Sequence, residues 1–216
     1  PNDYFYEVVR RDPGDVRANT QLGIYWRKAC DYETAKRHLR TALRRQTANE
    51  TRVADGEAMY NLGLILKAEG NYKAEIDTLY RAAWDYEYAS ASYYQLAQIS
   101  SIQGNPVQAL HEAKMAVNYN GMNVDAKLLF AALLRENGKK AAAAALAWEV
   151  LVFDPVSHCA AYELVKAGKM SGRDFSKLLR GDAESYVELA VRYLNCGFPK
   201  EASAILSLAP QSYPTV

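Results

Sequence analysis

Residues 59–83, MYNLGLILKAEGNYKAEIDTLYRAA, predict two antiparallel helices joined by a tight turn. Apolar side chains such as Leu62 and Leu66 recur at helical spacing and form one stripe. Gly70 supplies the left-handed backbone conformation that ends many helices, and the Asn71 side chain is suited to cap the helix that follows. This stretch is therefore expected to form a helical hairpin.

The same pattern recurs along the chain at a step of 34 residues. Three series of positions share the step: Gly70, Gly104 and Gly138; Ala82, Ala116 and Val150; and Leu62, Leu96 and Phe130. A repeat of this length is typical of helical pairs that stack on their neighbours and bury a continuous core. The chain is therefore predicted to be all-α, a right-handed α-solenoid of about six hairpins.

The repeated unit resembles the tetratricopeptide repeat (TPR), whose pattern is W-x2-L-G-x2-Y, then A-x3-F, a further alanine and a final proline. In the first unit the matching residues are Asn19, Leu22, Gly23, Trp26, Ala35, Leu39 and Ala42. In the fourth they are Phe130, Ala131, Leu134, Gly138, Ala143, Ala147, Val150 and Pro155, and in the sixth Tyr186, Leu189, Ala190, Tyr193, Gly197, Ala202 and Leu206. Residues 80–97 are also similar to repeats in the C-terminal part of large bacterial proteins that carry β-rich N-terminal domains of unknown function. Glu75 departs from the family pattern, which prefers alanine at that place.

The positions of the repeated residues predict that 1–216 is a single TPR-like solenoid. It begins with the second helix of a truncated repeat at 3–13, and repeats follow at 16–55, 56–89, 90–123, 124–157, 158–182 and 183–210. Extra residues near 46–55 predict a long turn in the first repeat, and the repeat at 158–182 is short and irregular. The opening helix lacks the partner that would precede it. We expect a fragment of a longer protein, with an apolar face at this helix that favours a homodimer.

The composition argues against several classes of partner. The 26 basic and 25 acidic residues give a net charge of +1, so no global field attracts nucleic acid. The longest apolar stretch, 141–153, contains Glu149 and is shorter than the ~20 residues of a membrane-spanning helix. Cys30, Cys159 and Cys196 show no metal-binding spacing and are interpreted as small buried residues of a cytoplasmic protein.

No pattern in the chain predicts catalysis, a cofactor or a metal site. The sequence contains no GxGxxG, GxxxxGK[ST], HExxH or GxSxG motif. His158 and Cys159 are adjacent, but neighbours on a helix point about 100° apart and cannot act as a nucleophile pair. His38 and His111 are interpreted as exposed helical residues. We therefore expect a protein that is not an enzyme.

In TPR arrays the first helices line a concave groove, and the resemblance implies which residues line it here. The candidate ligand-binding residues are Arg17, Thr20, Ile24, Arg27, Lys28, Tyr60, Leu64, Lys67, Tyr94 and Gln98. The same register adds Glu57, Ala68, Ala91, Ser101, Ile102, Asp125, Leu128, Ala132, Arg135 and Glu136. Cations among tyrosines suit an extended acidic peptide, whereas the alternative is an ordinary solvated face. Thr20 and Ile24 stand where one TPR subclass carries the lysine and asparagine that grip chaperone tails, so that activity is not expected.

Two functions follow from these observations. The first is a protein–protein interaction scaffold that holds an extended acidic segment in its groove. The alternative is a non-catalytic C-terminal packing or dimerisation module of a larger bacterial, carbohydrate-related enzyme. A second basic patch, Lys36, Arg37, Arg40, Arg44 and Arg45, is interpreted as a solvated convex face, with the docking of an acidic surface as its alternative.

Overall fold

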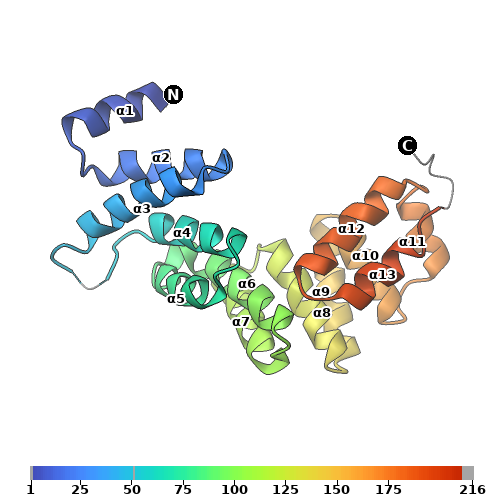
Figure 1. Ribbon diagram of the computed structural model, residues 1–216. Helices are drawn as coiled ribbons and strands as arrows, with labels where there is room; N and C mark the ends of the chain where they lie inside the picture. Colours follow the sequence, from blue (N-terminus) through green and yellow to red (C-terminus); the bar gives the residue numbers. More distant parts are fainter. Residues whose placement is uncertain (1, 51, 211–216) are drawn as a thin grey trace. The chain divides into compact units, whose positions relative to one another are not determined.

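The computed structural model describes residues 2–50 and 52–210, which form helices without any strand (Figure 1). The all-α expectation is confirmed. The helices are α1 (Asn2–Arg11), α2 (Val16–Lys28), α3 (Tyr32–Gln46), α4 (Glu57–Ala68), α5 (Tyr72–Ala82), α6 (Tyr86–Ile102), α7 (Pro106–Tyr119), α8 (Val124–Glu136), α9 (Lys140–Phe153), α10 (His158–Lys166), α11 (Gly172–Leu178), α12 (Ala183–Asn195) and α13 (Pro199–Leu206).

The chain forms two compact units, which divide between Tyr93 and Tyr94 in the middle of α6. In unit 1, α2 pairs with α3 and α4 pairs with α5, while α1 packs on α2. Its core is made of small and aliphatic side chains, including Leu39 and Ile65, which are fully buried. A Cβ atom at Gly63 would lie 2.7 Å from Leu79, so the small residue at this repeat position allows the two helices of the hairpin to approach.

In unit 2, α8 pairs with α9, α12 pairs with α13, and the short helices α10 and α11 pack together. Ala97 of α6 is buried against Ala109 and Ala113 of α7. The core around α10 and α12 is aromatic: Tyr162, Phe175, Tyr186 and Tyr193 are all at most 2% exposed. The Tyr162 ring lies 5.2 Å from Tyr193 and 5.7 Å from Phe175, whose ring is 6.3 Å from Tyr186, so the four rings pack against one another.

The helix ends follow the chemistry expected from the sequence. Gly70, Gly104 and Gly138 have left-handed backbone angles, with φ near +71° to +77°. The side chain of Asn71 accepts a hydrogen bond from the backbone N–H of Ala74 and caps α5. Pro106 and Pro199 stand at the first position of their helices, where the missing N–H leaves no bond unmade.

Two predictions about single residues were wrong. Cys30 is exposed and has φ of 61°, because it occupies the helix-ending position that later repeats give to glycine. His38 is only 8% exposed, and its Nδ1 lies 2.9 Å from Oδ1 of Asn19. The Asn19 side chain also donates to the carbonyl of Pro13, so His38 helps to hold the turn between α1 and α2.

Candidate functional site

The first helices of the two hairpins of unit 1, α2 and α4, are in contact. Gln21 Nε2 donates to Glu57 Oε2 at 3.2 Å, and Arg27 Nε donates to Asn61 Oδ1 at 3.0 Å. Because the later residue of α2 meets the later residue of α4, the two helices run parallel. The surface that carries these bonds is called the α2–α4 face; its side chains are Arg17, Gln21, Ile24, Arg27, Lys28, Glu57, Tyr60, Asn61, Leu64 and Lys67.

Charge is distributed unevenly along the α2–α4 face. Arg27 and Lys28 lie in the last turn of α2, and Lys67 lies in the last turn of α4. Glu57 lies in the first turn of α4, at the opposite end. Since the helices are parallel, three cations gather at one end of the face, while the other end carries one carboxylate, Glu57, and one cation, Arg17 at the start of α2.

Asn61 holds the Arg27 side chain in place. The Asn61 amide donates to the Glu57 carbonyl at 2.9 Å, which turns its oxygen toward Nε of Arg27. A guanidinium bound through Nε still presents its two terminal nitrogens, the fork that carboxylates accept in a bidentate manner. Asn61 was not among the residues predicted from the sequence; because the turn of the first repeat is long, it corresponds in the repeat to Gln21 and not to Arg27.

An aromatic pair borders the face. The ring of Tyr60 lies 5.7 Å from the ring of Tyr88, which comes from the first part of α6. Burial, followed by the charges of Glu57 and Asp55, raises the pKa of the Tyr88 hydroxyl far above its usual value. Tyr88 therefore stays a neutral hydroxyl at physiological pH and adds no negative charge beside Glu57.

The structure places the predicted residues of unit 1 in three ways. Arg17 and Lys28 are exposed. The half-buried members, which present part of their surface, are Ile24, Arg27, Tyr60, Leu64 and Lys67. Thr20 is only 3% exposed, and its hydroxyl donates to the Val16 carbonyl at 2.8 Å, so it offers no contact to a ligand.

In unit 2 the corresponding positions are covered by the chain's own last hairpin. Leu128, Ala132 and Arg135 of α8 are 3%, 2% and 6% exposed. Arg135 is held between α10 and α13, because its Nε is 2.9 Å from Glu163 and its Nη1 is 3.1 Å from Glu201. These residues were expected to line an open groove, and this expectation was wrong.

A network of charged and hydroxyl groups fixes the hairpin in this position. The Tyr193 hydroxyl of α12 donates to Glu163, and the Tyr162 hydroxyl of α10 donates to Glu201 at 2.7 Å. Lys166 lies 3.1 Å from the same Glu201 carboxylate. The carboxylates of Glu163 and Glu201 raise the pKa of Arg135 despite its burial, so this guanidinium remains charged.

The turn that follows α12 lies directly against the end of α6. Ser101 Oγ donates to the Cys196 carbonyl at 2.7 Å, and a Cβ atom at Gly197 would lie 2.8 Å from the backbone nitrogen of Ile102. Gln98, one of the predicted ligand-binding residues, donates to the Tyr94 hydroxyl and to Cys196 Sγ and is 5% exposed. Gln98 is therefore an internal contact of unit 2.

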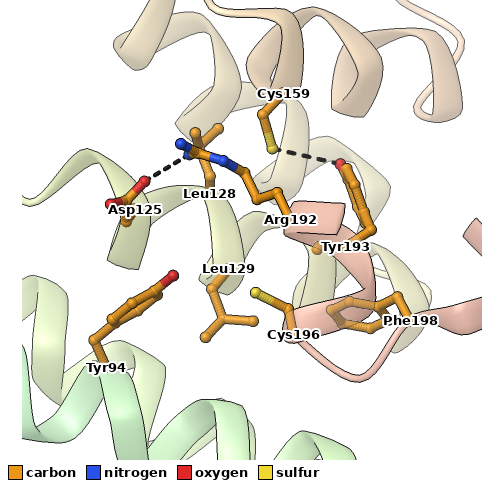
Figure 2. A pocket seen from close by; sticks show the side chains of 10 residues that line it. Tyr94, Asp125, Leu128, Leu129, Cys159, Arg192, Tyr193, Cys196 and Phe198 are labelled. Atoms are coloured by element: carbon orange, nitrogen blue, oxygen red, sulfur yellow. Dashed lines mark hydrogen bonds and ion pairs between the residues drawn. The ribbon is translucent and has the colours of Figure 1, made fainter. Parts of the chain in front are cut away.

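Figure 2 shows the small cavity that remains beneath this hairpin, of about 20 Å³. Tyr94 points toward it from α6, Leu128 and Leu129 from α8, and Cys159 from α10. Arg192 crosses its rim and is ion-paired with Asp125 at 2.6 Å. A space of this size holds about one water molecule, so Tyr94 has no room for a peptide on this side.

Residues 2–50 and 52–210 contain no group of three or more His, Cys, Asp or Glu side chains placed to hold a metal ion. Within the same part of the chain, every helix is too short or too polar to traverse a lipid bilayer.

No protein-family model matches the chain. Solved structures are similar to it, among them the following three. The first is YrrB, described as a TPR protein with an unusual peptide-binding site (16% identity over 96% of this chain and 91% of that one, TM-score 0.56). The second is a TPR protein from Parabacteroides merdae (18% identity, 89% and 77%, TM-score 0.62). The third is the C-terminal part of a TPR repeat-containing protein from Cytophaga hutchinsonii (12% identity, 98% and 90%, TM-score 0.66).

Proposed function

We propose that this chain, which has the fold of the TPR proteins, is an interaction scaffold that binds an extended acidic segment of a partner protein on the α2–α4 face. The observation that carries the proposal is the Arg27–Asn61 hydrogen bond, which orients a guanidinium fork beside Lys28 and Lys67. A peptide-binding site in the structurally similar YrrB supports a role of this kind. Arginine and lysine in such an arrangement select carboxylates.

The charge distribution on the α2–α4 face indicates how the bound acidic segment would be oriented. Its acidic residues contact Arg27, Lys28 and Lys67 at the C-terminal ends of α2 and α4, where the cations are not offset by a carboxylate of the face, whereas at the other end Glu57 offsets Arg17. Ile24 and Leu64 offer apolar contact between the two ends, and Tyr60 adds a rigid aromatic surface. Tyr94 and Gln98 belong to unit 2, and the proposal does not require them.

We expect the double charge reversal Arg27→Glu/Lys67→Glu to weaken binding of a glutamate-rich peptide by at least about tenfold, mainly through slower association. Affinity of the unaltered protein should also fall as salt rises, since exposed charges are screened within about 8 Å at physiological ionic strength. Surface plasmon resonance with an immobilised peptide measures both effects.

The matched control reverses two exposed lysines outside the α2–α4 face, Lys73→Glu/Lys114→Glu, and should leave the affinity within about twofold. A pull-down from cell extract then compares the partners of the unaltered and the Arg27/Lys67 variant proteins. Recovery of the same partners in equal yield by both proteins would show that the ligand binds elsewhere.

A second proposal is self-association through α1, which is favoured by the aromatic side chains at this end of unit 1. Tyr4, Tyr6 and Tyr25 are 69%, 41% and 42% exposed, and Trp26 donates to the Tyr6 hydroxyl at 2.9 Å. Tyrosine and tryptophan are enriched where protein surfaces pack against each other. The dimerisation module of a larger enzyme would use such a surface.

If α1 forms a homodimer, light scattering after gel filtration should give twice the monomer mass, and Tyr4→Glu/Tyr6→Glu should return the mass to that of the monomer. The charged side chains would have to be buried without partners in the interface, which is unfavourable. Trp148→Glu, at an exposed aromatic position of unit 2, is the control. A monomer mass for the unaltered protein at high concentration contradicts this proposal.

A further inference from the structure

A cleft of about 600 Å³ lies on unit 1 between the second helices of its two hairpins, α3 and α5. Arg37, Arg40 and Arg44 line it from α3, and Arg81 lines it from α5. We call this feature the arginine cleft. Its arginines come from the second helices of the hairpins, whereas the side chains of the α2–α4 face come from the first helices; α4 contributes different residues, Met59 and Leu62, to the cleft.

The arginines of the cleft have little compensating charge. Glu33 is the acidic residue that lines it, and its carboxylate is bound to Lys36 at 2.6 Å. Within the described part of the chain, none of the four arginines forms an ion pair with an acidic side chain. Gathered like charges destabilise a folded protein and attract ligands of opposite sign.

The spacing of the arginines matches a helical ligand. Arg37, Arg40 and Arg44 are spaced by three and then four residues on the exposed side of α3, so they lie about one turn apart, with rises of about 4.5 and 6 Å. A second helix with one carboxylate per turn repeats at the same interval. Each guanidinium offers a planar fork that a carboxylate can accept in a bidentate manner.

The floor of the cleft is apolar. It is formed by Leu43 of α3 and by Met59 and Leu62 of α4, of which Leu62 is the half-exposed member. An amphipathic acidic helix has leucine-like side chains beside its carboxylates and can contact this floor. A nucleic acid backbone has no equivalent group, and the net charge of +1 gives the chain no long-range attraction for a polyanion.

We propose that the arginine cleft docks an acidic amphipathic helix of a partner protein, with Asp or Glu side chains one turn apart. The carboxylates bind Arg37, Arg40, Arg44 and Arg81, and apolar side chains of the same helix rest on Leu62. The scaffold then holds two protein segments on different surfaces of unit 1.

The test uses a fluorescent synthetic helix that carries glutamates one turn apart beside leucines, stapled so that it is helical in solution. Fluorescence anisotropy of the whole chain should show saturable binding that weakens with salt. A peptide with glutamine in place of each glutamate should bind at least about tenfold more weakly. Hydrogen exchange should slow in α3 and α5 when the helix is bound.

Arg40→Glu/Arg44→Glu should abolish measurable binding of this helix, because repulsion replaces two charge-assisted contacts. Arg40→Lys/Arg44→Lys keeps the charge but loses the forks, and an intermediate affinity is expected. Arg27→Glu/Lys67→Glu, on the α2–α4 face, should bind the helix normally, so the two proposals can fail separately. Circular dichroism verifies that each variant is folded.

Three results would overturn the proposal. The first is the absence of saturable binding by the unaltered protein. The second is equal affinity in the unaltered protein and in the lysine and glutamate variants of Arg40 and Arg44. The third is displacement of the helix by a single-stranded oligonucleotide at lower concentration than by the unlabelled helix, which would assign the cleft to nucleic acid.

Discussion

Glu163→Ala is expected to lower the free energy of unfolding by about 3–5 kcal/mol, the typical effect of removing one partner from a buried ion pair. Glu163 is fully buried, and its carboxylate accepts from Nε of Arg135 at 2.9 Å and from the Tyr193 hydroxyl. Arginine cannot release its proton in the folded protein. The variant would therefore leave a buried charge with fewer partners and a buried tyrosine hydroxyl without its acceptor.

Chemical denaturation followed by circular dichroism measures this loss, and hydrogen exchange locates it. Protection should decrease first in α12 and α13, because the Glu163 network joins them to α8 and α10. The control is Glu136→Ala, which removes an exposed partner of the same Arg135 and should cost less than about 1 kcal/mol. The double change Arg135→Met/Glu163→Leu should recover most of the lost stability, since well-packed apolar residues can replace a buried pair.

A loss below about 1 kcal/mol for Glu163→Ala would contradict this account of unit 2. It would mean that the apolar contacts of α12, rather than the charged network, hold the last hairpin in place. In that case Gly197→Val should lower the free energy of unfolding more than Glu163→Ala does, because its added side chain would collide with the backbone of Ile102.

Glu75→Gln is expected to stabilise the protein above neutral pH. Glu75 of α5 is 0% exposed, and neither of its carboxylate oxygens has a hydrogen-bond partner among the described residues. Burial raises its pKa from 4.5 to about 7, although the charge of Lys67 opposes the shift. The protonated carboxyl is therefore favoured in the folded chain, and ionisation is costly.

The sign of the pH dependence follows from this shift. Because the folded pKa lies above the unfolded one, the carboxyl contributes its full stability below pH 4.5 and loses it as pH rises through about 7. As pH rises from 4.5 to above 7, the free energy of unfolding of Glu75→Gln should therefore increase by about 3 kcal/mol relative to that of the unaltered protein, because each unit of pKa shift corresponds to about 1.4 kcal/mol. Denaturation curves at several pH values measure the difference.

Asp77→Asn, on the exposed side of the same helix, is the control and should change the unfolding free energy by less than about 0.5 kcal/mol at each pH. A Glu75→Gln effect that is independent of pH would show that the carboxyl stays ionised or stays neutral throughout. The packing of the amide, and not the titration of Glu75, would then explain the change.

The repeat register predicted which helices of unit 1 carry the candidate site. It placed Arg27, Lys28 and Lys67 at the ends of first helices, and the structure has them there. It also identified Glu75 as an unusual residue at an alanine position. The register did not indicate Asn61 as the partner of Arg27, because a side-chain hydrogen bond between helices depends on rotamers as well as spacing.

The arginine cleft was likewise predicted only in part from the sequence. The run of basic residues on α3 was evident from the sequence, but as a solvated helical face. Arg81, Met59 and Leu62 complete the cleft from other helices, at distances along the chain that no local pattern reveals. Likewise, His38 was predicted to be exposed and is buried against Asn19 from the neighbouring helix.

The sequence by itself determined the helical hairpins, because helix periodicity, glycine at helix ends, and proline or asparagine at helix starts are local properties of the chain. Tertiary structure alone decided which predicted groove positions remain open. In unit 2 the hairpin α12–α13 folds back onto Arg135, Gln98 and Ser101 through residues more than 60 positions away. That contact depends on the combined fit of charge, hydroxyl groups and a glycine turn at Gly197, and these come together only when the whole unit has folded.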